Sequence, residues 1–312
     1  MGGFRDSANY EFIAEFESKK LTGNYIEFMR GKKRYSDKDI IVQEVLVSKT
    51  PQGETITKGK VVSVMPDEFS TLDIREIRID ENIPQNEYYA LLPAVKQIIR
   101  ESGVKLTKPI TFFVGENGIG KSTLIEAIAV AAGFNPEGGT RNYSFSTADS
   151  HSTLHEHIHL VRGIDRHYDG FFLRAESFYN AASYLDTMDS KVFQSYGGKS
   201  LHKLSHGESF LALVENRFSP DGLFILDEPE AAISPMRMLR LMADINELAK
   251  SGAQFIISTH SPILITLPES DIIQFSEDGL EHVEYQETEH YQVTKDFLAN
   301  PERMLRILLE EK

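Results

Sequence analysis

The stretch from Ile110 to Gly133 constrains this chain more than any other, because it reads as a strand, a glycine-rich loop and a helix in succession. Its first five residues, ITFFV, are apolar and rich in β-formers, which predicts one buried strand. The next eight, GENGIGKS, fit the phosphate-binding pattern G-x-x-x-x-G-K-[ST]. Residues 124–132 are rich in Ala, Leu and Ile and predict a helix, with Gly133 at its C-terminal stop. The pattern therefore stands in the context that phosphate binding requires.

The residue types of this loop predict the phosphates of a nucleotide and Mg²⁺ as ligands. Glycines let successive backbone N–H groups converge on phosphate oxygens, and the following helix N-terminus adds partial positive charge. Lys121 can reach the β- and γ-phosphates in a catalytic role, and the Ser122 hydroxyl can ligate Mg²⁺. The residues predicted to bind the nucleotide here are Gly115, Glu116, Asn117, Gly118, Ile119, Gly120, Lys121, Ser122 and Thr123.

Two further apolar runs end in residues suited to the same chemistry. The run 223–226 closes in Asp227 and Glu228, and the run 254–258 is followed by His260. Asp227 can hold Mg²⁺ through water, and Glu228 can accept a proton from an attacking water. His260 is predicted to donate to the γ-phosphate. An acidic surface loop would explain the two carboxylates, but not their place at the end of an apolar strand.

Other candidates depend on weaker signals. Ser205 and Gly207 precede a helix-like run at 210–216 and predict a second anion site. Arg174 and Glu176 end a short apolar strand and can reach a metal-bound water, while a structural ion pair is the alternative for Arg174. Tyr88 or Tyr89 can stack on adenine or pack in the core. Residues 72–79 alternate as an edge strand does.

Five histidines crowd between residues 151 and 167, and we expect them on the surface of an amphipathic helix, with a metal site as the alternative.

Composition limits the remaining classes. The chain has 312 residues, of which 41% are hydrophobic, enough for one large domain with an appendage or for two domains. It contains no cysteine, which excludes disulfides and thiolate metal sites. The net charge of −14 disfavours nonspecific binding to DNA or anionic membranes. No apolar run approaches the roughly 20 residues of a membrane span. We therefore expect a cytoplasmic protein that does not insert into membranes.

The order of these motifs resembles that of the ABC-type ATPases. The phosphate loop, LSHGES, LFILDEPE and STHSP are similar, in that sequence, to the Walker A, signature, Walker B and switch-histidine motifs of that superfamily. Within it, GFFLRAESF, SHGESFLAL and LDEPEAAISP most resemble small stand-alone ATPases close to the Rad50, RecF and SMC heads. The resemblance covers roughly residues 72–312. His206 and Ser234 depart from it, standing where relatives usually carry a glycine and an aspartate.

The resemblance implies an α/β P-loop fold: a mainly parallel core sheet, an antiparallel β subdomain and a helical signature subdomain. It implies that the nucleotide is ATP, and it assigns the ATPase domain to residues 71–312, with the helical lobe at about 140–215. Residues 1–70 lie outside the resemblance as an extension, for which two β-rich runs separated by turn residues predict a β-hairpin. It makes Asp227 the metal support, Glu228 the general base and His260 the γ-phosphate sensor. Glu176 stands at the plausible place of a further metal-orienting residue.

Relatives form a two-fold homodimer in the ATP state, in which Ser205 and Gly207 act on the nucleotide of the other subunit. The resemblance thus implies an ATP-hydrolysing switch that drives or times a protein partner. Nucleic-acid maintenance or defence, with DNA or RNA as a further partner, is the role we favour from the sequence. A nucleotide-binding subunit of an ABC transporter is one alternative. A nucleotide-gated protein that controls an effector or toxin is another.

Overall fold

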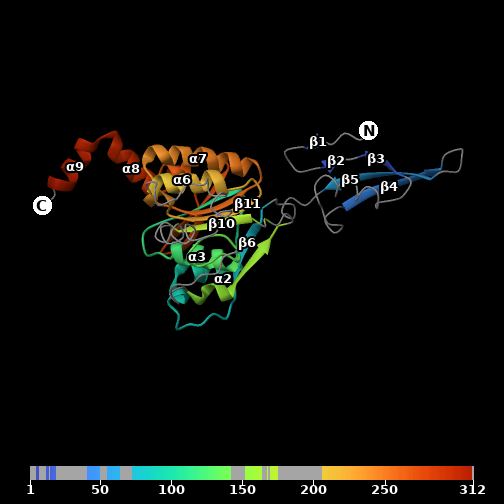
Figure 1. Ribbon diagram of the computed structural model, residues 1–312. Coiled ribbons are helices and arrows are strands. Elements are labelled where there is room, and N and C mark those ends of the chain that lie inside the picture. Colours follow the sequence, from blue (N-terminus) through green and yellow to red (C-terminus); the bar gives the residue numbers. More distant parts are fainter. Residues whose placement is uncertain are drawn as a thin grey trace, which may run out of the picture. The chain divides into compact units, whose positions relative to one another are not determined.

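The computed structural model describes residues 72–141, 152–163, 167, 169–174 and 206–310, together with five short strands before residue 72 (Figure 1). The chain divides into two compact units, one formed by 1–73 with 162–166 and the other by 74–161 with 167–312. In the first unit β1 (Arg5–Asp6) pairs with β2 (Phe12–Ile13), and β5 (Thr55–Ser63) lies between β3 (Glu15–Ser18) and β4 (Ile41–Lys49). All of these pairings are antiparallel.

The second unit is built on a six-stranded sheet in the order β10-β11-β12-β8-β13-β14. The first five strands run parallel, and β14 pairs antiparallel with β13. The strands are β8 (Ile110–Val114), β10 (Asp169–Arg174), β11 (Gly222–Asp227), β12 (Gln254–Ser258), β13 (Ser270–Ser276) and β14 (Gly279–His282). Continuous apolar runs form the central strands because both faces of a parallel sheet are covered. The predicted mainly parallel core sheet is confirmed.

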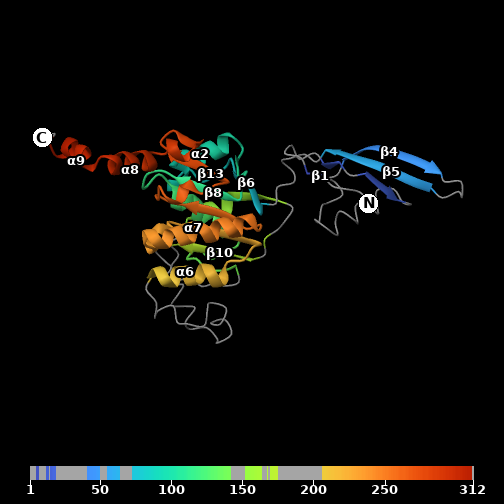
Figure 2. The ribbon, with the colours of Figure 1, turned by 90° about the horizontal axis from the view of Figure 1, so that it is seen from above.

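Helices cover both faces of this sheet (Figures 1 and 2). Figure 1 shows α6 (His206–Arg217) and α7 (Pro235–Lys250) on one face and α3 (Lys121–Ala131) on the other. Helices α2 (Pro93–Arg100), α8 (Glu289–Ala299) and α9 (Pro301–Glu310) complete the α-helices of the described residues. Among those residues, no helix combines the length and apolar character that crossing a membrane requires.

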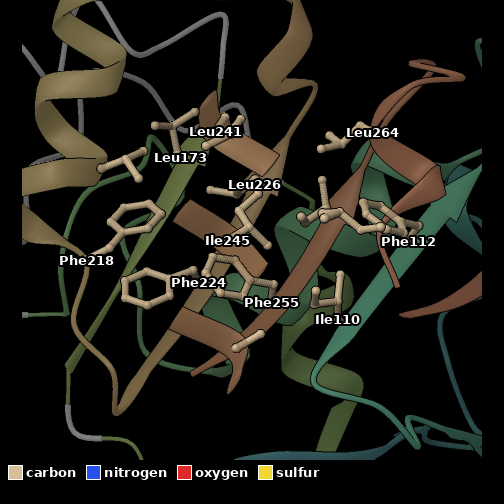
Figure 3. Packing of buried hydrophobic residues seen from close by; sticks show 14 of the residues in the cluster. Ile110, Phe112, Leu173, Phe218, Phe224, Leu226, Leu241, Ile245, Phe255 and Leu264 are labelled. Carbon is tan, nitrogen blue, oxygen red and sulfur yellow. The ribbon is translucent and has the colours of Figure 1, made fainter. Parts of the chain in front are cut away.

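The core between the sheet and α7 is aromatic and tightly packed (Figure 3). The rings of Phe218 and Phe224 stack with centroids 4.0 Å apart, and Phe255 lies 5.2 Å from Phe224. Leu241 and Ile245 of α7 are completely buried against them. Burying one such side chain stabilises a fold by about 1.5–3 kcal/mol. This layer therefore contributes strongly to holding α7 against the sheet.

A second, three-stranded sheet has the order β7-β6-β9, with β6 (Ile74–Ile79), β7 (Val104–Lys105) and β9 (Ile158–Arg162). The prediction of an edge strand at 72–79 was wrong, because β6 is the central strand. Its first residue is tied to the core sheet: the Gln254 side chain accepts from the Ile74 N–H at 2.8 Å and donates to the Ile74 carbonyl at 2.7 Å.

The structure bears on two expectations about residues 140–215. The range predicted as the helical lobe, about 140–215, includes the strands β9 and β10, and much of the remainder lies outside the described residues, so the lobe stays a prediction. The described histidines of the 151–167 cluster do not lie on an α-helix. Residues Thr153–His157 form a short 3-10 helix that leads directly into β9. His157 and His159 instead face the carboxylate of Asp80.

Candidate active site

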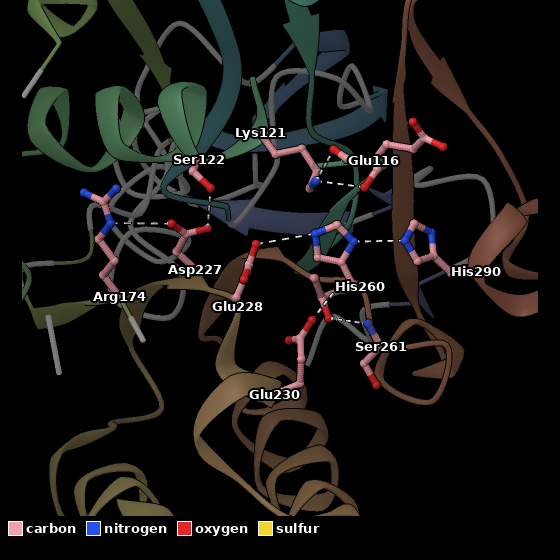
Figure 4. A network of polar contacts seen from close by, with 12 residues as sticks. Glu116, Lys121, Ser122, Arg174, Asp227, Glu228, Glu230, His260, Ser261 and His290 are labelled. Atoms are coloured by element: carbon pink, nitrogen blue, oxygen red, sulfur yellow. Dashed lines mark hydrogen bonds and ion pairs between the residues drawn. The ribbon is translucent and has the colours of Figure 1, made fainter. Parts of the chain in front are cut away.

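Four parallel strand ends meet at one edge of the core sheet and build the site (Figure 4). Asp227 is level with Arg174 on one side and with Ser258 on the other, and Ser258 is level with Phe113. The segments that follow these strands therefore emerge side by side. This is the crevice at the carboxyl ends of strands where open α/β sheets bind ligands.

The loop after β8 has the shape of a phosphate cradle. Gly115, Gly118 and Gly120 all have positive φ, at 142°, 81° and 103°. A Cβ at Gly115 would lie 2.5 Å from the Phe275 carbonyl oxygen, whereas a Cβ at Gly118 would meet nothing within 4 Å. The tip of the loop is thus open to a ligand while its base is packed. Of the other predicted loop residues, Glu116 and Asn117 are exposed, and Ile119, Ser122 and Thr123 are half-buried.

Lys121 folds back into this loop. Its side chain is 4% exposed, and Nζ donates to the carbonyls of Gly115 and Glu116, both at 2.8 Å. Burial lowers the pKa of Lys121, while nearby carboxylates, Glu228 first among them, oppose that shift. The two carbonyls hold the ammonium at the place where phosphate oxygens of a nucleotide would take over as acceptors.

Ser122 and Asp227 offer oxygen ligands to a metal ion. The Ser122 hydroxyl donates to Asp227 Oδ1 at 3.3 Å. Burial raises the pKa of Asp227 to about 6, although the positive charge of Arg174 opposes the shift. Among the described residues, no group of three or more histidines and carboxylates is placed to hold a metal. One hydroxyl and one carboxylate nevertheless fit Mg²⁺, which usually completes its shell with phosphate oxygens and water.

Arg174 joins Asp227 to the helix behind the loop. Its NH1 lies 2.5 Å from Oε2 of Glu126 in α3, and its Nε lies 3.8 Å from Asp227 Oδ2. The sequence left Arg174 open between metal-bound water and an ion pair, and the structure places it in ion pairs. Glu126 gave no sequence signal, because an acidic residue in a helix is ordinary.

Glu228 and His260 face each other across the crevice. Glu228 has φ 52°, a left-handed conformation that is rare for a residue with a side chain and that often marks a functional position. Its Oε1 lies 3.4 Å from His260 Nε2. The backbone N–H of His260 donates to Glu230 Oε1 at 2.5 Å, so Glu230 fixes the histidine loop. Burial raises the pKa of Glu230, whose role the sequence did not predict.

A second histidine that the sequence analysis missed completes the site. His290 Nε2 lies 2.9 Å from His260 Nδ1 (Figure 4). His290 belongs to α8, 30 residues further along the chain. No local pattern marks it, since a histidine near a helix start is usually a surface residue.

Some predicted positions are not part of this constellation. Ser205 and Glu176 lie outside the described residues. Gly207 is buried in the first turn of α6, and none of the contacts given above involves it. Of the two tyrosines, Tyr89 is fully buried and bonds to Thr153, as core packing predicts, whereas Tyr88 is 55% exposed.

Parts of this chain are similar in sequence to known proteins. Residues 92–177 match a family described as "AAA domain", and residues 209–266 match one described as "AAA domain, putative AbiEii toxin, Type IV TA system". A "putative ABC transporter ATP-binding protein" of Bacillus thuringiensis subsp. konkukian is 24% identical over 227 residues. That alignment covers 69% of this chain and 36% of the relative, so this chain spans about a third of that protein.

Two solved structures align with this chain at low similarity. One is cbiO1 of Clostridium perfringens, part of the cbiONQ ABC transporter complex, at 16% identity and a TM-score of 0.41, covering 76% of this chain and 99% of that chain. The other is an inward-facing "putative metal-chelate type ABC transporter", at 14% identity and a TM-score of 0.41, covering 72% and 88%.

Proposed function

Because this chain is an ABC-type P-loop ATPase, we propose that it works as a switch that binds Mg-ATP, hydrolyses it and changes its association state with each cycle. One observation carries the proposal: the buried His260 Nε2 makes no close hydrogen bond within the part of the chain that the structure describes, and only Glu228 Oε1, at 3.4 Å, faces it as an ion-pair partner. This nitrogen is turned toward Glu228, and Asp227 and Lys121 lie on the same side of the ring (Figure 4). A buried donor with only a distant acceptor is poorly satisfied, and a terminal phosphate oxygen would give it a closer one.

The chemistry follows from the residues around that atom. Backbone N–H groups of the loop and Lys121 bind the β- and γ-phosphates, and His260 Nε2 donates to the γ-phosphate. Ser122 and Asp227 hold Mg²⁺, which when bound neutralises phosphate charge. Glu228 accepts the proton of the attacking water. Asp227 remains a metal support, and Arg174 keeps its carboxylate directed toward Ser122.

The test compares three single variants by calorimetry and by phosphate release. Lys121→Met is expected to abolish ATP binding. Glu228→Gln is expected to keep ATP binding and to lower hydrolysis by about 100-fold or more. Lys250→Met, at the C-terminal end of α7, removes a lysine outside the site and should behave as the wild type. The proposal is wrong if the wild-type protein takes up no ATP or if Lys121→Met leaves uptake unchanged.

We further propose that ATP brings two copies together. The chain has one phosphate loop and a second anion motif, at Ser205 and Gly207. A two-fold interface would give this second motif a role, because each copy's motif would contact the nucleotide bound by the other copy. Release of the γ-phosphate then removes the shared ligand and shifts the population back to monomers. Glu176 is proposed as an additional residue that orients the metal.

The favoured role is nucleic-acid maintenance or defence, supported by the resemblance to Rad50-like heads. A cytoplasmic location suits a protein that depends on ATP and Mg²⁺. ATP hydrolysis stimulated several-fold by added DNA or RNA is the expected result. Unchanged hydrolysis with both nucleic acids would count against this role.

A transporter subunit is the second candidate, supported by the name of the Bacillus relative. Purification with a membrane protein of several spans would favour it. A third candidate, control of an effector or toxin, has support from the description of the family matched at residues 209–266. Trapping the ATP state with Glu228→Gln and identifying the co-purifying protein separates these two.

A further inference from the structure

His290 contacts His260 from outside all four sequence motifs. The two rings lie with centroids 5.0 Å apart and planes inclined by 52°, and the Nε2–Nδ1 distance is 2.9 Å. At this distance one of the two nitrogens donates a hydrogen bond to the other. His260 is thus held through its Nδ1 by a residue of another element, while its Nε2 faces the crevice.

The turn that carries His290 is firmly anchored. Thr288, the N-cap of α8, is 1% exposed, and its hydroxyl donates to the Tyr285 carbonyl at 2.7 Å. Glu284 and Glu287 form a reciprocal capping box immediately before it. The rings of Tyr285 and Tyr291 pack edge to face with centroids 5.1 Å apart. Packing and capping therefore hold the backbone of the turn from which His290 extends toward His260.

The surrounding acceptors decide which nitrogen carries the proton. Nε2 of His260 faces Glu228 Oε1 at 3.4 Å, and a terminal phosphate oxygen would also be an acceptor. These acceptors favour the tautomer of His260 that carries its hydrogen on Nε2. In a neutral imidazole Nδ1 is then bare and accepts, so the donor is Nε2–H of His290. The chain of hydrogen bonds runs from His290 through His260 toward the phosphate.

The environment of both rings favours their neutral forms. Burial lowers the pKa of His260 and of His290, and the positive charge of Lys121 lowers both further. The charged groups that face the pair come from the loop, from the Walker B segment and from α8: Lys121, Glu116, Glu228, Glu230 and Glu289. Once a neutral His260 carries its hydrogen on Nε2, the hydrogen bond between the two rings runs from His290 to His260.

We propose that His290 is a positioning residue for the ATPase reaction: its hydrogen bond fixes the ring plane and the Nε2–H tautomer of His260. This inference rests on the proposed function, because it assigns His260 the γ-phosphate. It also links the nucleotide to α8, since loss of the γ-phosphate changes what His260 donates to. The sequence motifs alone end at the histidine loop and contain no partner for Nδ1.

Steady-state kinetics test the role. His290→Ala should lower kcat by about 10-fold, the lower end of the loss caused by removing the partner of a metal-ligating histidine, because His260 is assigned the γ-phosphate and no metal but is likewise oriented by its partner. KM should change by less than about twofold, because the interaction matters most in the transition state. His290→Gln keeps an amide N–H that can reach Nδ1 and should restore most of kcat. His159→Ala removes a histidine paired with Asp80 on the other sheet and is the matched control.

Nitrogen-15 NMR of labelled histidines, recorded without nucleotide, tests the pairing independently of hydrolysis. The expected spectrum shows His260 as the Nε2–H tautomer in the wild type and in His290→Gln, and as a tautomer mixture in His290→Ala. An unchanged His260 tautomer in His290→Ala overturns the inference. So does a loss of kcat in a folded His290→Ala protein that His290→Gln does not rescue. A wild-type protein without ATPase activity would defeat the proposed function instead, and the tautomer measurement would still decide the pairing.

Discussion

The buried carboxylate of Asp227 would be stabilised by a bound cation, and its ionised form is unfavourable in the cation-free protein. Its pKa is raised from 3.8 to about 6, because burial disfavours the charged carboxylate. Between these two pH values the folded protein binds more protons at this residue than the unfolded chain does. Its contribution to stability is therefore lost as pH rises through that window. Above pH 6 the ionised carboxylate destabilises the nucleotide-free fold by up to about 3 kcal/mol.

The prediction is that Asp227→Asn stabilises the nucleotide-free protein at pH 7.5 by about 1–3 kcal/mol, and much less at pH 4. The same variant should lose Mg²⁺-dependent ATP hydrolysis. Urea unfolding at half-unit pH steps from 4 to 8 measures the first effect. Asp221→Asn, an exposed position just before β11, is the control and should leave the pH dependence unchanged. Equal pH slopes for Asp227→Asn and wild type between pH 4 and 6 would contradict this account.

Gly115 must remain a glycine for two separable reasons, its φ of 142° and its contact with the Phe275 carbonyl. Gly133 has φ 94° but open space at its Cβ position. Gly133→Ala should therefore cost only the left-handed strain, about 1–2 kcal/mol. We expect Gly115→Ala to cost clearly more and to abolish ATP binding, while Gly133→Ala keeps it. Thermal unfolding and calorimetry of both variants check the difference, and equal losses of stability would refute the contact argument.

At the scale of elements, one glutamine joins the two sheets of the second unit. Gln254 is the first residue of β12, is completely buried and satisfies both backbone groups of Ile74 in β6. The sequence predicted both strands, but it assigned β6 to an edge because nothing near residue 74 indicates a partner 180 residues away. Alternation of apolar residues indicates that one face of a strand is buried, but it does not indicate which strands pair with it.

Gln254→Leu should destabilise the fold by about 2–4 kcal/mol, because a buried N–H and a buried C=O are left without partners. Gln292→Leu, on the exposed face of α8, is the matched control and should change stability by less than about 0.5 kcal/mol. Denaturant unfolding of both variants gives the comparison. A Gln254→Leu protein as stable as the control would mean that water replaces the lost hydrogen bonds.

At the scale of the whole molecule, the ATP state is expected to be dimeric. Glu228→Gln mixed with Mg-ATP should elute at twice the mass of the nucleotide-free protein in size-exclusion chromatography with light scattering. Hydrolysis is blocked in that variant, so the shared γ-phosphate persists. Adding Lys121→Met should return the protein to monomers. Adding Ser205→Glu instead should keep ATP binding and prevent the dimer by placing negative charge against the partner's phosphate. A monomer under every condition would contradict the proposed mechanism.

Local patterns in the sequence were enough for the glycine loop, the helix after it and the polar residues at two strand ends. The reason is that each of these is encoded within a dozen residues: glycines permit the loop, and an apolar run followed by Asp227-Glu228 or by His260 marks a strand that ends at an edge. Because parallel strands end at the same edge of a sheet, these polar residues are then expected to lie close together. Ser205, Gly207 in its partner-facing role, and Glu176 remain predictions.

Only the tertiary structure revealed the residues that hold this chemistry in place. Glu126 reaches Arg174, Glu230 bonds the His260 backbone and His290 supports the His260 ring, each from a different element. Their residue types are ordinary where they occur in the sequence. Their roles depend on the order of the strands and on the position of His290 in α8 beside His260. Both depend on packing between segments that are distant in the sequence, so no local sequence pattern indicates them.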